Sequence, residues 1–124
     1  MKQLKIILKV SAILGIIGIV AWPPVVLSQS PESTPVDRGK NLYAGHCASC
    51  HGMTGDGSGP DATGMTPPPT RIRGGGINGL TDNDLEQAIL AGKPNTEMRG
   101  YGTILRGPEI SDMIAYLRSL SALP

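Results

Sequence analysis

Apolar residues recur at helical spacing in three stretches of this chain, and no stretch alternates with the two-residue period of a half-buried strand. The first stretch opens at Thr34, which can cap a helix that has Pro35 at its first position and Asp37 three residues after the cap. One face of this helix then carries Val36, Gly39, Tyr43 and Cys47. We therefore expect a helix from Pro35 down to the cysteines.

The second and third stretches carry equally local start and stop signals. Thr81 can cap the second helix, with Asp84 three residues later and Gly92 as the stop. Pro108 opens the third helix, and Arg118 lies near its C-terminal end. The inward positions are Leu85, Ala88 and Ile89 in the second helix, and Ile110, Met113, Ile114, Leu117 and Leu120 in the third.

A long loop separates the first two helices. Twelve of the 25 residues from 52 to 76 are Gly or Pro, and a loop of this length in a small domain is usually functional or wrapped around something. The predicted fold class is all-α, with three main helices and long Gly/Pro-rich loops.

The N-terminal residues differ in composition from the rest of the chain. Residues 1–28 combine three lysines with the uncharged apolar run Val10–Trp22, which predicts either an export signal cleaved after Ser28 or an uncleaved anchor from about Ile6 to Leu27. Residues 29–35 are a Ser/Pro linker, and residues 36–124 form the folded domain. Because the lysines of this segment stay on the cytoplasmic side, the rest of the chain should cross the membrane. We therefore expect the domain in the periplasm or on the outer face of the cytoplasmic membrane, either soluble or tethered.

The folded domain has little material for a core and little net charge. Residues 36–124 hold eight Lys/Arg and nine Asp/Glu, and no basic stripe suggests nucleic acid as a partner. The chain has no Phe, and its one Trp lies in residues 1–28. A domain of this size with so few large side chains buries a marginal core. We therefore expect a large apolar cofactor inside it.

Both cysteines and both histidines lie within His46–His51. Cys47-Ala48-Ser49-Cys50-His51 is the C-x-x-C-H pattern of covalent c-type haem attachment, in which two thiols one turn apart add to the vinyl groups and the histidine ligates iron. A Cys47–Cys50 disulfide is one alternative, although it would close a very short loop and so add little stability. A thioredoxin-like dithiol is another, although it would have to follow a strand of a βαβ unit, which this sequence does not predict. A zinc site is a third, although four adjacent residues cannot easily surround one tetrahedral ion.

The second axial ligand, if there is one, must come from a methionine. Met98 lies 47 residues after His51, in a loop between two helices, and so can approach the far face of the haem. Met53 is too close to His51, Met65 would need a tight loop, and Met113 belongs to the stripe of the last helix. The alternative for Met98 is a solvent-facing loop residue.

From Val36 to Leu120 the chain resembles class I c-type cytochromes, in particular bacterial mono-haem members. "RGKNLYAGHCASCHG" matches the opening helix of that family and "DMIAYLRSL" matches the closing helix. Gly39 lies where the family usually has a glycine, and Tyr43 and Tyr116 lie where it usually has aromatic residues. The resemblance implies that these helices cross at Gly39. It also implies that the Pro60 carbonyl accepts the N–H of His51, and that "MRGYG" supplies Met98. This chain departs from the family at Arg99, where many members have a proline directly after the ligand methionine.

Three functions compete at this stage. The first is a single-electron carrier with a His51/Met98-ligated haem, in a respiratory or photosynthetic chain, with redox proteins as partners. The second is a haem subunit of a membrane oxidoreductase complex. The third is a five-coordinate haem that binds gases or peroxide. The sequence contains no base–nucleophile or carboxylate pair, so we expect an electron carrier rather than an enzyme.

Overall fold

The computed structural model describes residues 32–124, in which every regular element is a helix. The elements are α2 (Pro35–His46), α3 (Ala48–His51), the 3₁₀ turn η2 (Pro60–Ala62), α4 (Asp82–Ala91) and α5 (Gly107–Ser121). The all-α prediction is therefore confirmed. The interpretation of residues 1–28 as signal or anchor, and the first three linker residues, 29–31, lie outside the described residues. None of the helices within residues 32–124 has both the length and the apolar character that a membrane span requires.

The predicted helix starts are confirmed in detail. Thr34 and Asp37 form a reciprocal capping box at α2, in which the Asp37 N–H donates to Thr34 Oγ1 at 3.1 Å. Thr81 and Asp84 do the same at α4, and Gly92 ends that helix with a φ of 74°. Each cap joins residues three apart in sequence, so it depends only on local sequence.

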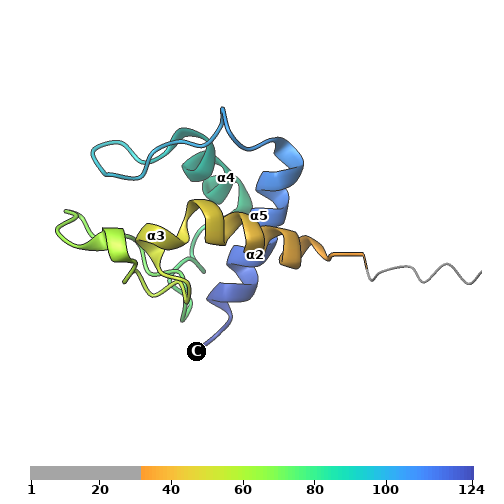
Figure 1. Cartoon of the computed structure of the whole chain (residues 1–124), viewed down its shortest axis with the longest axis horizontal. Helices are drawn as coiled ribbons and strands as arrows, with labels where there is room; N and C mark the ends of the chain where they lie inside the picture. Colours follow the sequence, from red (N-terminus) through yellow and green to blue (C-terminus); the bar gives the residue numbers. More distant parts are fainter. Residues whose placement is uncertain (1–31) are drawn as a thin grey trace, which may run out of the picture. The chain divides into compact units, whose positions relative to one another are not determined.

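α2 and α5 cross closely, as Figure 1 shows for the orange and blue helices. A Cβ added at Gly39 would lie 2.7 Å from the carbonyl carbon of Asp112 and 2.8 Å from Cβ of Tyr116, so only glycine fits the crossing. The rings of Tyr43 and Tyr116 pack beside it with centroids 5.2 Å apart. The crossing that the family resemblance implied at Gly39 is therefore confirmed.

Two arginines tie α5 to the rest of the domain. Arg38 of α2 donates two hydrogen bonds to the Asp112 carboxylate, at 2.7 and 2.8 Å. Arg118 donates to the Asp82 carboxylate at the start of α4 and, at 2.6 Å, to the carbonyl of Leu80. The last helix is thus bonded to both other main helices, or to their caps, by side chains as well as by packing.

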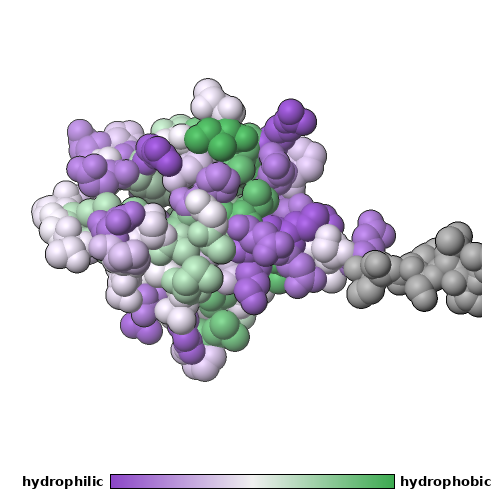
Figure 2. Space-filling model, viewed as in Figure 1, coloured by the Kyte–Doolittle hydropathy of each residue, from purple (hydrophilic) through white to green (hydrophobic). Residues whose placement is uncertain are grey.

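The predicted stripe of α5 is buried, and Met113 is completely inaccessible to solvent. Val36, which lies in the first turn of α2, is 37% exposed. The core consists of Tyr43, Ala48, Ile72, Ile77, Leu85, Ile89, Leu105, Ile110, Met113, Ile114, Tyr116, Leu117 and Leu120. Hydrophilic residues cover much of the face drawn in Figure 2, where apolar residues form separate patches.

Candidate functional site

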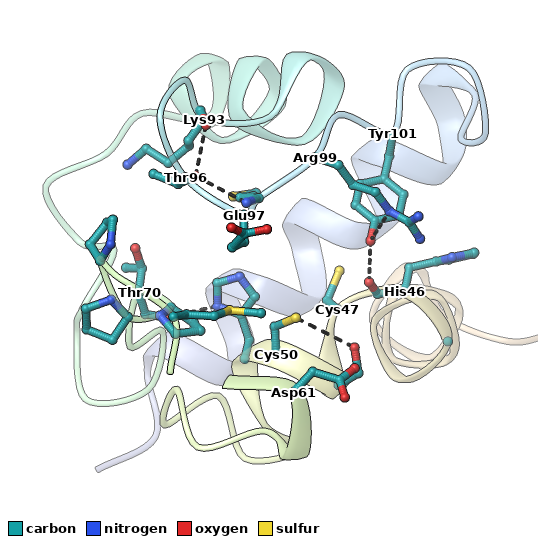
Figure 3. A pocket seen from close by; sticks show the side chains of 18 residues that line it. His46, Cys47, Cys50, Asp61, Thr70, Lys93, Thr96, Glu97, Arg99 and Tyr101 are labelled. Carbon is teal, nitrogen blue, oxygen red and sulfur yellow. Dashed lines mark hydrogen bonds between the residues drawn. The ribbon is translucent and has the colours of Figure 1, made fainter. Parts of the chain in front are cut away.

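A cavity of about 640 Å³ lies between the cysteine segment and the loop that follows α4. In Figure 3 Cys47 and Cys50 approach it from one side, and Lys93, Thr96 and Glu97 lie on the opposite side. This volume is within the range of about 300–1,000 Å³ that is usual for ligand pockets. The motif identified in the sequence therefore opens onto a space large enough for a cofactor.

The first helix is interrupted at Cys47, which sequence analysis did not anticipate. Cys47 has φ −122° and ψ −33°, and the short helix α3 starts anew at Ala48. The N–H groups of Cys50 and His51 both donate to the Cys47 carbonyl, at 3.2 and 2.9 Å. This single tight turn holds both thiols and the imidazole on one wall of the cavity.

Both thiols are free and half-buried. Burial, and then the charge of Cys50, raises the pKa of Cys47 to about 11. A thioredoxin-like dithiol needs a nucleophile whose pKa is lowered. The environment of Cys47 therefore opposes that alternative.

The ring of His51 is oriented by Thr70, and the expectation for Pro60 was wrong. Nδ1 of His51 lies 2.9 Å from the carbonyl oxygen of Thr70. A carbonyl only accepts, so Nδ1 carries the proton and Nε2 keeps the lone pair that a metal ligand needs. One N–H cannot serve both carbonyls well, and Pro60 instead begins the 3₁₀ turn η2.

The loop after His51 is fastened so that the Thr70 carbonyl meets the ring. The N–H groups of Ile72 and Arg73 both donate to the carbonyl of Gly55, at 2.7 and 3.0 Å. Asp56 accepts from Ser58 N–H at 3.0 Å, which closes a turn at this point of the loop. These bonds bring residues 69–73 back against the turn that follows α3.

Met98 lines the cavity from a short loop that returns on itself. The Lys93 N–H donates to the Met98 carbonyl at 2.9 Å, and Met98 N–H donates to Thr96 Oγ1 at 3.2 Å. Gly92 permits the close approach, since a Cβ there would lie 2.7 Å from the carbonyl carbon of Arg99. Met98 is half-buried and lies on a different segment from His51, as its spacing suggested.

The other methionines divide between core, surface and cavity. Met113 is core, as expected, and Met53 is 58% exposed. Met65, which we expected to reach only through a tight loop, also lines the cavity. Pro67–Pro69 line it as well, so the prolines after Met65 run along this wall.

Sequence analysis missed a polar cluster at the cavity edge. The Tyr101 hydroxyl donates to the backbone carbonyl of His46 at 2.7 Å, and the Arg99 guanidinium lies 5.2 Å from the centre of the Tyr101 ring. The dashed line in Figure 3 marks the bond between Tyr101 and His46. Its partners are 55 residues apart, so no local pattern could have identified it.

The donor set fits a covalently attached haem. Two free thiols, an imidazole with Nε2 available and a thioether all line one cavity. A family model described as Cytochrome c matches residues 36–121.

Two solved structures resemble parts of this chain. One is the Kuenenia stuttgartiensis reducing HAO-like protein complex Kustc0457/Kustc0458, with 30% identity, a TM-score of 0.60, and coverage of 68% of this chain and 42% of that one. The other is the dihydro-heme d1 dehydrogenase NirN in complex with DHE, with 26% identity, a TM-score of 0.55, and coverage of 70% of this chain and 16% of that one. The chain thus spans less than half the length of either.

Proposed function

The chain belongs to the cytochrome c family and binds haem c covalently, and on this premise we propose that it carries single electrons between redox proteins, with His51 and Met98 as axial ligands. The observation that carries the proposal is that these two side chains line the same cavity from separate segments. When bound, haem iron supplies the one-electron ferric/ferrous couple, which methionine ligation shifts to higher potential.

Each residue of the site has a distinct task in this proposal. Cys47 and Cys50 tether the cofactor, and their position on one turn fixes its orientation relative to α3. Thr70 holds the His51 ring in one tautomer and raises its basicity by accepting the Nδ1 proton. Met98, which lines the same cavity, would ligate the haem iron and so exclude oxygen, peroxide and other small ligands.

Replacement of Met98 by leucine tests this ligand set. Met98→Leu should abolish the weak far-red band of the iron–thioether bond, lower the reduction potential, and let ferrous protein bind carbon monoxide. A leucine of similar size keeps the cavity wall while removing the sulfur. Optical titration with carbon monoxide and potentiometry provide the measurements.

Met65 provides the matched control, because it is the other methionine of the same cavity. Met65→Leu should leave the far-red band unchanged. If Met65→Leu removes the band and Met98→Leu does not, the ligand assignment is reversed. Rapid carbon monoxide binding by the wild-type protein, unchanged by Met98→Leu, would establish a five-coordinate haem that binds gases or peroxide.

A haem subunit of a larger oxidoreductase is the second candidate function. It is favoured by the two similar structures, since the match covers only 42% and 16% of those longer chains. In either case we propose that the domain works on the outer side of the cytoplasmic membrane, exported by residues 1–28. The mass of the exported protein separates a cleaved signal, which suits a free carrier, from a retained anchor, which suits a tethered carrier or subunit.

A further inference from the structure

The loop that carries Met98 is joined to α4 along its backbone. The N–H groups of Tyr101 and Gly102 donate to the carbonyls of Ile89 and Leu90, at 2.8 and 3.1 Å. The bond from Lys93 N–H to the Met98 carbonyl closes the loop on itself. These contacts position the loop relative to α4, but they do not connect it to the wall that holds the cysteines and His51.

One hydrogen bond makes that connection. Among the hydrogen bonds of residues 32–124, the 2.7 Å bond from Tyr101 to the His46 carbonyl is the one that links residues 92–106 to α2 or α3. His46 is the last residue of α2 and immediately precedes Cys47. The bond therefore crosses from the Met98 loop to the point where the cysteine turn begins.

The Tyr101 ring is held so that its hydroxyl points to this acceptor. Tyr101 is half-buried and packs against the hydrophobic core. The His46 ring meets it edge-on, with centroids 5.7 Å apart, and the Arg99 guanidinium lies 5.2 Å from its centroid. Arg99 directly follows Met98, so the same cluster also restrains the backbone next to the proposed ligand.

We propose that Tyr101 is a positioning residue that holds the Met98 loop against the cysteine wall and so determines how firmly Met98 keeps its axial position. The proposal rests on Met98 being the sixth ligand. An outside ligand can bind iron only when the loop has moved Met98 away, so its apparent affinity increases with the fraction of molecules in that open state. Removing the Tyr101 hydroxyl enlarges that fraction and leaves the ring in place.

The test measures imidazole binding to the ferric holoprotein, with loss of the far-red iron–thioether band as the signal of binding. A hydrogen bond of this kind contributes a net stability that corresponds to roughly a three- to tenfold change in an equilibrium constant. Tyr101→Phe should therefore bind imidazole roughly three- to tenfold more tightly than wild type. Without imidazole, the variant should still show the band.

Tyr43 offers a matched control. Its hydroxyl also donates to a backbone carbonyl at 2.7 Å, that of Gly52, but on the cysteine wall. Tyr43→Phe should lower the unfolding temperature while leaving imidazole affinity unchanged. His46→Ala keeps the backbone acceptor but removes the ring that packs edge-on against Tyr101, so its imidazole affinity should lie between those of wild type and Tyr101→Phe.

Three results would overturn the inference, and they are distinguishable. Equal imidazole affinities for wild type and Tyr101→Phe, with the band present in both, would refute the role of Tyr101 alone. So would an equal increase in Tyr43→Phe, because the effect would then follow overall stability. A wild-type protein without the far-red band would refute both the ligand set and the inference that rests on it.

Discussion

The two walls of the haem cavity are built in different ways. On the cysteine wall, the N–H, the carbonyl and Nδ1 of His51 each make a hydrogen bond, to Cys47, Gly57 and Thr70. On the Met98 wall, the hydrogen bonds of Met98 within residues 32–124 go only to residues within five positions of it, Thr96 and Lys93.

The comparison shows that the two proposed ligands are held to different degrees. His51 lies next to the attachment cysteines, whereas Met98 must reach the iron from a separate loop. His51 is fixed by contacts that extend through the long loop, and α2 behind it is locked by the crossing with α5. Met98 depends on a small loop and one cross-connection through Tyr101. We infer that changes on the cysteine wall affect whether the protein folds and holds haem, whereas changes on the Met98 wall affect the ligands and the reduction potential of the iron.

The largest effect should follow loss of the two thiols. In the double variant Cys47→Ala, Cys50→Ala, no haem should remain on the protein after denaturing electrophoresis. Helical circular dichroism should also be largely lost, because the apolar core is marginal for a domain of this size without the porphyrin. Haem staining and far-ultraviolet spectra are the measurements. A cooperatively folding apoprotein, or a purified wild-type protein that contains zinc and no iron, would contradict this prediction.

A smaller effect is expected at the helix crossing behind the cysteine wall. Gly39→Ala places a methyl group against the Asp112 backbone and Tyr116, and should lower the free energy of unfolding by about 1–3 kcal/mol or more. Gly45 lies on the same helix, where an added Cβ meets nothing within 4 Å. Gly45→Ala should instead raise stability by about 0.5–1 kcal/mol, through helix propensity. Denaturant titration of both variants checks the pair, and equal effects would show that propensity alone governs α2.

The smallest effect should come from the ion pair that fastens the same crossing. The hydrogen bonds from Arg38, and then its charge, lower the pKa of Asp112. A carboxyl with a lowered pKa in the folded state adds stability above its unfolded pKa of about 3.9, and this contribution is lost as the pH falls through the folded value. The unfolding temperature of wild type should therefore be higher than that of Asp112→Asn at pH 7, and the difference should shrink below about pH 4. A difference that does not change with pH would mean that charge makes no contribution.

The sequence predicted the elements well where the signals are local. The capping boxes at Thr34 and Thr81 join residues three apart, and the stop at Gly92 depends on a backbone conformation that glycine favours. The break at Cys47 was missed, because nothing in its neighbours signals a change of helix. Boundaries within a continuous helical pattern depend on what each end packs against.

The site was predicted in part, for related reasons. Cys47, Cys50 and His51 lie on one wall because they share a turn, which the spacing already implied. The carbonyl that meets His51 was misassigned to Pro60, since the bonds from Ile72 and Arg73 to the Gly55 carbonyl bring Thr70 to the ring instead. Met65 was discounted as an axial ligand because it would need a tight loop to reach the iron, yet it lines the cavity together with Met98.

By itself, the sequence determined three helices and their caps, a covalent attachment turn, and a methionine on a separate loop. Only the tertiary structure decided that Thr70 orients His51, that Tyr101 bonds to His46, and that Arg38 pairs with Asp112 across 74 residues. The physical reason is the separation in sequence between the residues that make each contact. A cap or a C-x-x-C turn is closed by residues that the chain already holds together, whereas long-range pairs depend on how the intervening loops pack, and no local pattern encodes that path.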